Sequence, residues 1–176
     1  MSLLVNRMIR AAKLDVHLYE EVKADKGALG QAMGIVVLST LVPCVIGTFD
    51  IGGFALTAAD MVLCAEVLFF WYGWVLSTYL LGTKLPPIPE THVTHNELLR
   101  TVGFAMSPGI IQVLGIIPGL QPLALAAGVW TLVATVIAVR QALGYHSTLR
   151  AIALCVVALM PSYVVFGLIG GIVRGL

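Results

Sequence analysis

Charged residues are scarce in this chain of 176 residues. Asp, Glu, Lys and Arg make up only 11% of the sequence, against 59% hydrophobic residues. The mean hydropathy of +0.99 lies well above the range of soluble globular chains. The formal net charge is +1, which excludes the basic field that nucleic-acid binding needs and the acidic tail of a solvating linker. The composition therefore predicts a membrane protein that has no nucleic-acid partner.

Cysteine and catalytic motifs are scarce as well. Cys44, Cys64 and Cys155 stand alone inside apolar runs, without the spacing of a zinc site or a disulfide framework. We interpret them as small core residues. The sequence lacks a phosphate-binding loop, a zinc motif and a nucleophile beside an evident base. Asp60 and Glu66 are six residues apart on one predicted helix, so they do not converge like the paired acids of an aspartyl protease. We predict no enzyme activity, no cofactor and no metal.

Long apolar runs are what the sequence has in abundance. A helix needs about 20 apolar residues to cross the hydrocarbon core of a bilayer. Runs of that length occupy five ranges, namely 29–49, 58–82, 100–119, 122–143 and 149–172. The sequence therefore predicts an all-α fold in which residues 29–176 form a domain of five transmembrane helices.

The first 28 residues have a different composition, with five basic and four acidic residues. The apolar run that begins near Leu29 starts too late and is too long for a cleaved signal peptide. Apolar residues recur every three or four positions in this segment: Val5, Ile9, Ala12, Val16 and Tyr19. That spacing predicts one amphipathic helix. It could lie in the headgroup layer, dock on a partner protein or pack on this chain's own helix ends. Arg7, Arg10 and Lys13 are the candidate lipid or partner contacts.

Basic residues predict the topology. With the N-terminus in the cytoplasm, the five basic residues of the first segment and four others lie on the inner side, nine in all, whereas only Arg174 lies outside. The four others are Lys84, Arg100, Arg140 and Arg150. This asymmetry follows the positive-inside rule. An odd number of spans then places the C-terminus outside.

The third apolar run contains RTVGFAMSPGIIQVLGIIPGL at residues 100–120, with two prolines, Pro108 and Pro118, and four glycines. Pro108 removes a helical hydrogen bond and crowds the carbonyl four residues earlier, which predicts a kink near Phe104. The glycines allow another helix to approach closely: Gly103, Gly109, Gly115 and Gly119. Such a broken helix shapes a packing surface or frames a transport site.

Glu66 is the one clear ionisable residue deep inside a predicted span, so it is a functional candidate. At about 1.5 Å per residue, Glu66 and Gln112 lie at similar depth in the outer half. We predict that they face each other and form a polar clamp, with a proton or ion relay as the alternative. Arg140 lies near the inner end of the fourth span, where its side chain is expected to extend to the headgroups.

Two further patterns concern contacts. The aromatic run FFWYGW, residues 69–74, lies around the middle of the second span, so some rings pack inside and others meet lipid or another chain. Trp71 and Trp74 are the candidate contacts there, and a pigment or quinone is an alternative occupant. Gly167, Gly171 and Gly175 recur at intervals of four, which predicts a smooth face for close contact with the first span or with another protein.

The loop TKLPPIPETHVTHNELLR joins the second and third spans. Its three prolines favour extended chain. His92 and His95 would suit a metal, but Thr94 and Glu97 have the spacing of a capping box at the start of a helix. We interpret this stretch as a helix cap.

Several stretches together resemble the bacterial branch of the Yip1 domain family: MIRAAKLDVHLYEEVKAD, GQAMGIVVL, LLRTVGFAMSPG, IIPGL and VWTLVATVIAVRQALGYHSTLRAIAL. The resemblance covers nearly the whole chain and is most specific at residues 103–109 and 138–143. It implies a five-helix protein of the bacterial inner membrane with a cytosolic N-terminal segment. In eukaryotic relatives it also implies binding of prenylated Rab GTPases, but the acidic motif of those proteins has no counterpart here.

These patterns favour a non-enzymatic scaffold or accessory subunit. Its helix faces and N-terminal segment would bind other membrane proteins, bind a second copy of this chain, or organise lipid. The alternative is a small ion or solute transporter built around Pro108 and Glu66. A third possibility is a membrane-curvature factor that acts through residues 1–28.

Overall fold

The fold was analysed in a computed structural model, which describes residues 3–50, 58–84 and 93–175, with side chains described over 3–42, 61–84 and 93–168. Over the described ranges the chain is helical and contains no strand. The helices follow in the order α1 (Leu3–Ala12), α2 (Val16–Ala24), α3 (Ala28–Asp50), α4 (Ala58–Lys84), α5 (His95–Ala105), the 3₁₀ helix η1 (Ser107–Ile116), α6 (Gln121–Ala142), α7 (Thr148–Val157) and α8 (Leu159–Gly175).

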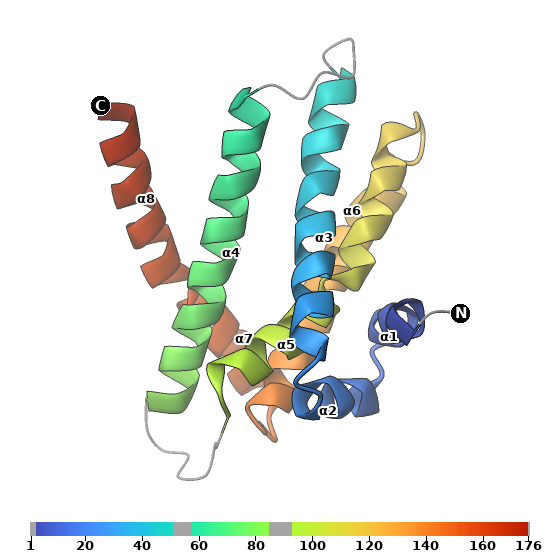
Figure 1. The fold of residues 1–176 in the computed structure, drawn as a ribbon, viewed down its shortest axis with the longest axis vertical. Coiled ribbons are helices and arrows are strands. Elements are labelled where there is room, and N and C mark those ends of the chain that lie inside the picture. Colours follow the sequence, from blue (N-terminus) through green and yellow to red (C-terminus); the bar gives the residue numbers. More distant parts are fainter. Residues whose placement is uncertain (1–2, 51–57, 85–92, 176) are drawn as a thin grey trace.

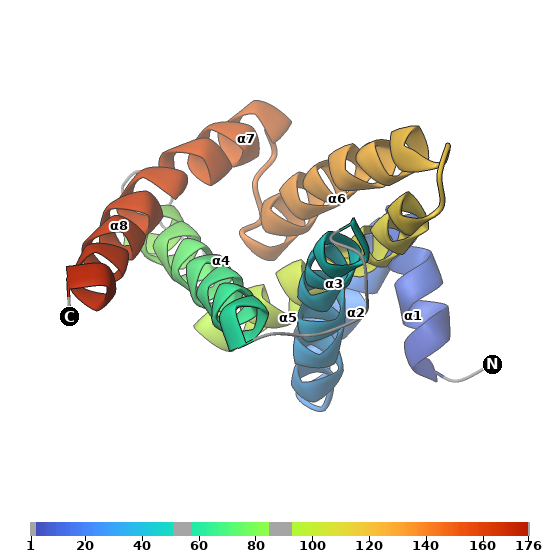
Figure 2. The ribbon, with the colours of Figure 1, turned by 90° about the horizontal axis from the view of Figure 1, so that it is seen from above.

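The long helices rise from a layer of short ones. Helices α2, α5 and α7 gather at the lower end in Figure 1, with α1 just above α2. Seen from above, α4 and α8 form one group, and α3, η1 and α6 form another, with α1 at its edge (Figure 2). Helices α5 and α7 connect the two groups, because each packs against α4 and α6.

Four helical stretches are long and apolar enough to cross a membrane: Met61–Lys84, His95–Ile116, Gln121–Ala142 and Thr148–Leu168. They correspond to the last four predicted spans. The first predicted span, 29–49, lies within α3, where the apolar stretch with described side chains is Ala28–Val42. The rest of that span lies outside the described side chains. The described part of the chain is therefore an all-helical protein with four candidate spans.

The last span is not one continuous helix, contrary to the prediction. Helix α7 ends at Val157 and α8 begins at Leu159. Pro161 explains the interruption, because it has no N–H to donate to the carbonyl of Val157 and its ring crowds that carbonyl. This proline was the signal that the sequence interpretation missed.

The N-terminal segment also differs from the single amphipathic helix that was predicted. It forms two helices, α1 and α2, and the chain turns sharply between them. Leu14 in this turn has a φ of 59°, a left-handed conformation that residues with a side chain rarely adopt. We refer to residues 3–24 as the N-terminal hairpin.

Candidate functional site

The candidate site combines the interrupted third span with the N-terminal hairpin that packs over it. Helix α5 ends at Ala105, and η1 begins at Ser107 with Pro108 in its first turn. The sequence predicted an interruption in this place. The backbone there is satisfied locally, since the Ser107 hydroxyl donates to the Phe104 carbonyl at 2.6 Å and the Met106 N–H donates to the Gly103 carbonyl at 3.2 Å. The break is thus a stable turn between two helix types.

The interior beside this break is apolar and closely packed. The Phe104 ring is fully buried in a cluster with residues of α1, α2 and α3: Ala11, Leu18, Val22, Ala28, Ala32 and Ile35. Met8 of the hairpin and Met106 and Ile110 of the break pack against the same cluster. The hairpin therefore covers this side of the break with hydrocarbon.

Gly103 allows the closest helix approach at this site. A Cβ atom at Gly103 would lie 2.8 Å from the Ala32 Cβ and 3.1 Å from the Ala32 carbonyl oxygen. No side chain fits in that space, so α5 meets α3 through the glycine surface. Gly109 is looser, because a Cβ there would meet the Ser39 Cβ at 3.4 Å, an ordinary contact distance.

Beyond the break, η1 brings Gln112 against α6. A 3₁₀ helix has three residues per turn, so Gly109, Gln112 and Gly115 fall in one row along η1. The Gln112 amide nitrogen lies 3.6 Å from a Cβ built on Gly109 and 3.9 Å from one built on Gly128 of α6. Gln112 and Pro118 also line a hollow of about 360 Å³ between η1 and α6.

The predicted clamp between Glu66 and Gln112 is therefore wrong. Helix η1 packs against α6, α3 and α1, and α4 lies on the other side of α3 (Figure 2). The depth estimate assumed a continuous third helix facing α4, whereas the break turns η1 toward α6.

Glu66 instead lies on the stripe of α4 that faces α8. It is spaced four and eleven residues from Phe70 and Ser77, so the three share one side of the helix. The Phe70 ring contacts the rings of Tyr163 and Phe166 at centroid distances of 5.0 and 5.7 Å, and the Ser162 hydroxyl donates to that of Ser77 at 3.4 Å. Glu66 is thus half-buried on the side of α4 that faces α8, away from the break.

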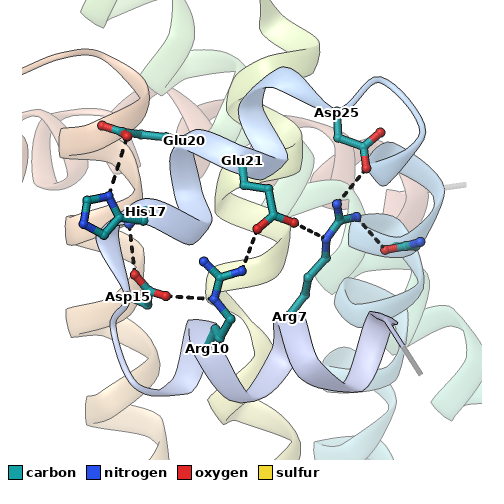
Figure 3. Close-up of polar contacts among 8 residues, drawn as sticks. Arg7, Arg10, Asp15, His17, Glu20, Glu21 and Asp25 are labelled. Carbon is teal, nitrogen blue, oxygen red and sulfur yellow. Dashed lines mark hydrogen bonds and ion pairs between the residues drawn. The ribbon is translucent and has the colours of Figure 1, made fainter. Parts of the chain in front are cut away.

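Two arginines of α1 hold the hairpin closed (Figure 3). Arg7 pairs with Glu21 at 2.9 Å and with Asp25 at 2.8 Å, and it also donates to the Gln31 side chain at 3.2 Å. Arg10 pairs with Asp15 at 2.8 Å and with Glu21 at 2.6 Å. Arg7 is only 5% exposed. These two side chains were candidate lipid or partner contacts, and the structure pairs both of them within the chain.

The ion pairs lower the pKa values of the carboxyl groups. For Glu21 the hydrogen bond from Arg10 is the main cause of the lowered pKa, and the bond from Arg7 adds to it. For Asp25 the lowered pKa comes first from Arg7 and then from the Gly27 N–H. Hydrogen bonds to the charged form favour that form, so these carboxylates stay ionised in the folded hairpin.

Three long-range hydrogen bonds attach the hairpin to the bundle, each to the carbonyl end of a helix. The Trp130 ring donates to the Ala12 carbonyl at 2.7 Å, where α1 ends. Arg100 donates to the carbonyl of Lys23 near the end of α2, and the Lys23 ammonium donates to the Ala142 carbonyl at 2.9 Å, where α6 ends. Cations are stabilised at helix C-termini. Sequence reasoning missed these contacts, because each joins residues 77 to 119 positions apart.

The aromatic run of α4 points in several directions. Trp74 is buried, and its ring N–H donates to the Cys155 carbonyl at 3.0 Å, so it is a core residue and no partner contact. Trp71 packs half-buried against a second core cluster, which contains Trp74, Leu98 and Val139, whereas Phe69 and Tyr72 are exposed.

The loop before α5 carries the predicted cap. The Glu97 N–H donates to the Thr94 hydroxyl and the Thr94 N–H donates to the Glu97 carboxylate, which confirms the capping box. His95 lies edge-on to the rings of Tyr72 and Tyr79, and His92 lies outside the described residues. No group of metal-binding residues occurs among the described side chains.

The remaining candidates are scattered. Arg140 is half-buried and donates to the Thr148 hydroxyl at 2.9 Å, and Lys13 is exposed beside the hairpin turn. Gly167 has no atom within 4 Å of a built Cβ, so no described helix of this chain packs against it. Gly171 and Gly175 lie outside the described side chains.

The cysteines differ from one another. Cys64 is disulfide-bonded, which corrects its interpretation as an isolated core cysteine, while Cys155 is free and buried.

Comparisons with protein-family models, curated proteins and solved structures find no match to this chain. The resemblance to the Yip1 domain family therefore stays an expectation from the sequence.

Proposed function

We propose that this protein is a non-enzymatic membrane scaffold or accessory subunit, with an architecture like that of the Yip1 domain family. The observation that carries the proposal is the apolar cover over the break at Pro108. Transport proteins use broken helices to expose backbone groups to a polar cavity, but here Phe104 and the hairpin fill that position with hydrocarbon. Such a break shapes a surface for packing.

The exposed helix faces supply the contact surface of the scaffold. One stripe of α6 carries three exposed apolar residues at helical spacing, Leu125, Val129 and Leu132. Helix α8 presents a second such face with Met160, Val164 and Leu168. In a bilayer these faces meet lipid, another membrane protein or a second copy of the chain.

We also propose that the N-terminal hairpin lies on the cytoplasmic side of a bacterial inner membrane. Five basic residues in the first 28 support this orientation. The disulfide at Cys64 supports it too, because α4 begins at the end of the bundle opposite the hairpin and disulfides persist in oxidising compartments (Figure 1).

Purification in mild detergent tests the scaffold proposal. We expect the tagged full-length chain to retain specific membrane proteins, or to run as a defined oligomer of itself. Alanine substitutions at Val129 and Leu132 on α6, and separately at Val164 and Leu168 on α8, should show which face is bound, since only one pair should release the partner.

Reconstitution in liposomes tests the transporter alternative. Glu66→Gln removes the carboxylate on the side of α4 that faces α8, and Glu20→Gln is the matched control on the exposed face of the hairpin. A monomeric, partner-free chain that moves ions, and that stops doing so only in Glu66→Gln, would overturn the scaffold proposal.

A further inference from the structure

We propose that α1 is an interfacial membrane anchor, whose outer flank inserts between the lipids of the leaflet on the hairpin side. This inference deepens the lipid-organising part of the proposed function. It rests on how α1 distributes its side chains among three flanks.

The first two flanks of α1 contact the chain itself. Leu4, Met8 and Ala11 pack into the cluster around Phe104. Arg7 and Arg10 face α2 and pair with its carboxylates (Figure 3). The charged flank is thus neutralised inside the hairpin.

The third flank of α1 is apolar and exposed. Val5 and Ile9 are each two residues from Arg7, about 200° around the helix, so they lie on the side away from the ion pairs. They are 39% and 38% exposed. An amphipathic helix that pairs its charges within the chain and presents aliphatic side chains is suited to the boundary between headgroups and acyl chains.

Position in the fold identifies lipid as the partner. Helix α1 runs crosswise to the long helices (Figures 1 and 2), the orientation of an interfacial helix. It packs on η1, which belongs to a candidate span, and its end is bonded to Trp130 of a second candidate span. The end of α1 therefore lies beside Trp130, next to the exposed Val129 of α6.

The residues beside α1 suit a phospholipid surface. Trp130 is 47% exposed although its ring N–H is hydrogen-bonded to the end of α1, so its ring presents apolar surface beside this helix. Lys13 follows α1 directly and is exposed, where it can meet a lipid phosphate. The segment 3–13 holds no acidic residue that would oppose this contact.

Lipid quenching of a fluorescent amino acid tests the inference. A small environment-sensitive fluorophore is introduced at Ile9 of the full-length chain, in nanodiscs whose phospholipids carry bromine near the carbonyl end of the acyl chain. We expect a loss of fluorescence at position 9 and protection there from iodide in the water. Position 20 is the control, since the Glu20 side chain on α2 is 68% exposed, and it should show the reverse pattern.

A second label, introduced at Val5, ensures that the result does not depend on local disruption of the structure by the fluorophore at position 9. Quenching of both positions by iodide, with no effect of brominated lipid, would overturn the inference by placing the flank in water. Protection of both from iodide and from lipid bromine would overturn it by placing the flank against protein. This experiment uses the isolated chain. Its result is therefore independent of the purification in detergent, and either the anchor or the scaffold proposal can be overturned while the other stands.

Discussion

Arg7 is a buried arginine in α1, a helix whose other flanks carry apolar side chains. Its guanidinium contacts Glu21, Asp25 and Gln31, so its donors have partners on three sides. A planar group with several fixed donors can join several acceptors at once. This one side chain therefore links α1, the end of α2 and the start of α3.

Substitution of this residue should loosen the hairpin. We expect Arg7→Met to lower the free energy of unfolding by about 1–3 kcal/mol, because two carboxylates lose a partner. The effect is below that of a fully buried pair, since the Glu21 and Asp25 side chains are 38% and 37% exposed and stay hydrated.

Denaturant unfolding in detergent or nanodiscs measures this difference. Arg10→Met is the matched control, and because its side chain is 33% exposed we expect a loss below about 1 kcal/mol. Equal losses for the two variants would show that Arg7 has no special role.

Acid should act on the same contacts. The pKa values of Asp15, Glu21 and Asp25 are lowered in the folded hairpin by hydrogen bonds from arginine. Groups with a lowered pKa stabilise the fold above their unfolded pKa, about 4, and lose that contribution as the pH falls through the folded value. We expect the protection of α1 amides from hydrogen exchange, relative to an unfolded chain at the same pH, to fall only below about pH 4. Arg7→Met should flatten this pH dependence, and an unchanged profile would contradict the assignment.

At the scale of single elements, the third span uses two helix types to fit its neighbours. Ten residues of 3₁₀ helix extend about 20 Å, whereas an α-helix of the same length extends about 15 Å. The 3₁₀ form also places Gly109, Gln112 and Gly115 in one row, so α6 packs against a surface of small residues with one amide.

The two glycines of this span should respond differently to alanine. We expect Gly103→Ala to destabilise the protein by about 1–3 kcal/mol, because the new methyl group overlaps Ala32 and overpacked sites force the backbone to shift. Gly109→Ala is the matched control on the same span and should change stability by less than about 1 kcal/mol, since its contacts begin at 3.4 Å. Thermal unfolding in nanodiscs compares the pair, and a reversed order would refute the close approach of α3 and α5.

At the scale of the whole molecule, the two ends of the bundle differ. The hairpin lies at one end, and α8 runs to the other (Figure 1). Odd numbers of spans place the termini on opposite sides of a membrane, as we propose here. A reporter that works only in the cytoplasm should be active when fused to the N-terminus and inactive at the C-terminus. A periplasmic reporter should give the reverse result, and activity of both fusions on one side would contradict five spans.

Sequence patterns predicted the helices better than they predicted the contacts between helices. Pro108 marked the end of α5 correctly, and Thr94 with Glu97 marked its start, because both effects are local. The prediction that Gln112 faces Glu66 was wrong, because the change from an α-helix to a 3₁₀ helix rotates every later residue. The prediction of one N-terminal helix was wrong for a similar reason. The apolar stripe from Val5 to Tyr19 assumes one straight helix, and the turn at Leu14 divides it. Contacts such as Lys23 with Ala142 depend on the whole topology.

The same long-range contacts set an order for biogenesis. The hairpin is synthesised first, yet its bonds to Trp130 and Ala142 require residues made 118 and 119 positions later. At about 5–20 residues per second of translation, the segment waits on the order of ten seconds before its docking surface exists. During that interval the newly made amphipathic segment is available to chaperones, the insertion machinery or the bilayer itself. The first part of the chain to be made can thus close onto the bundle only after α6 has been synthesised.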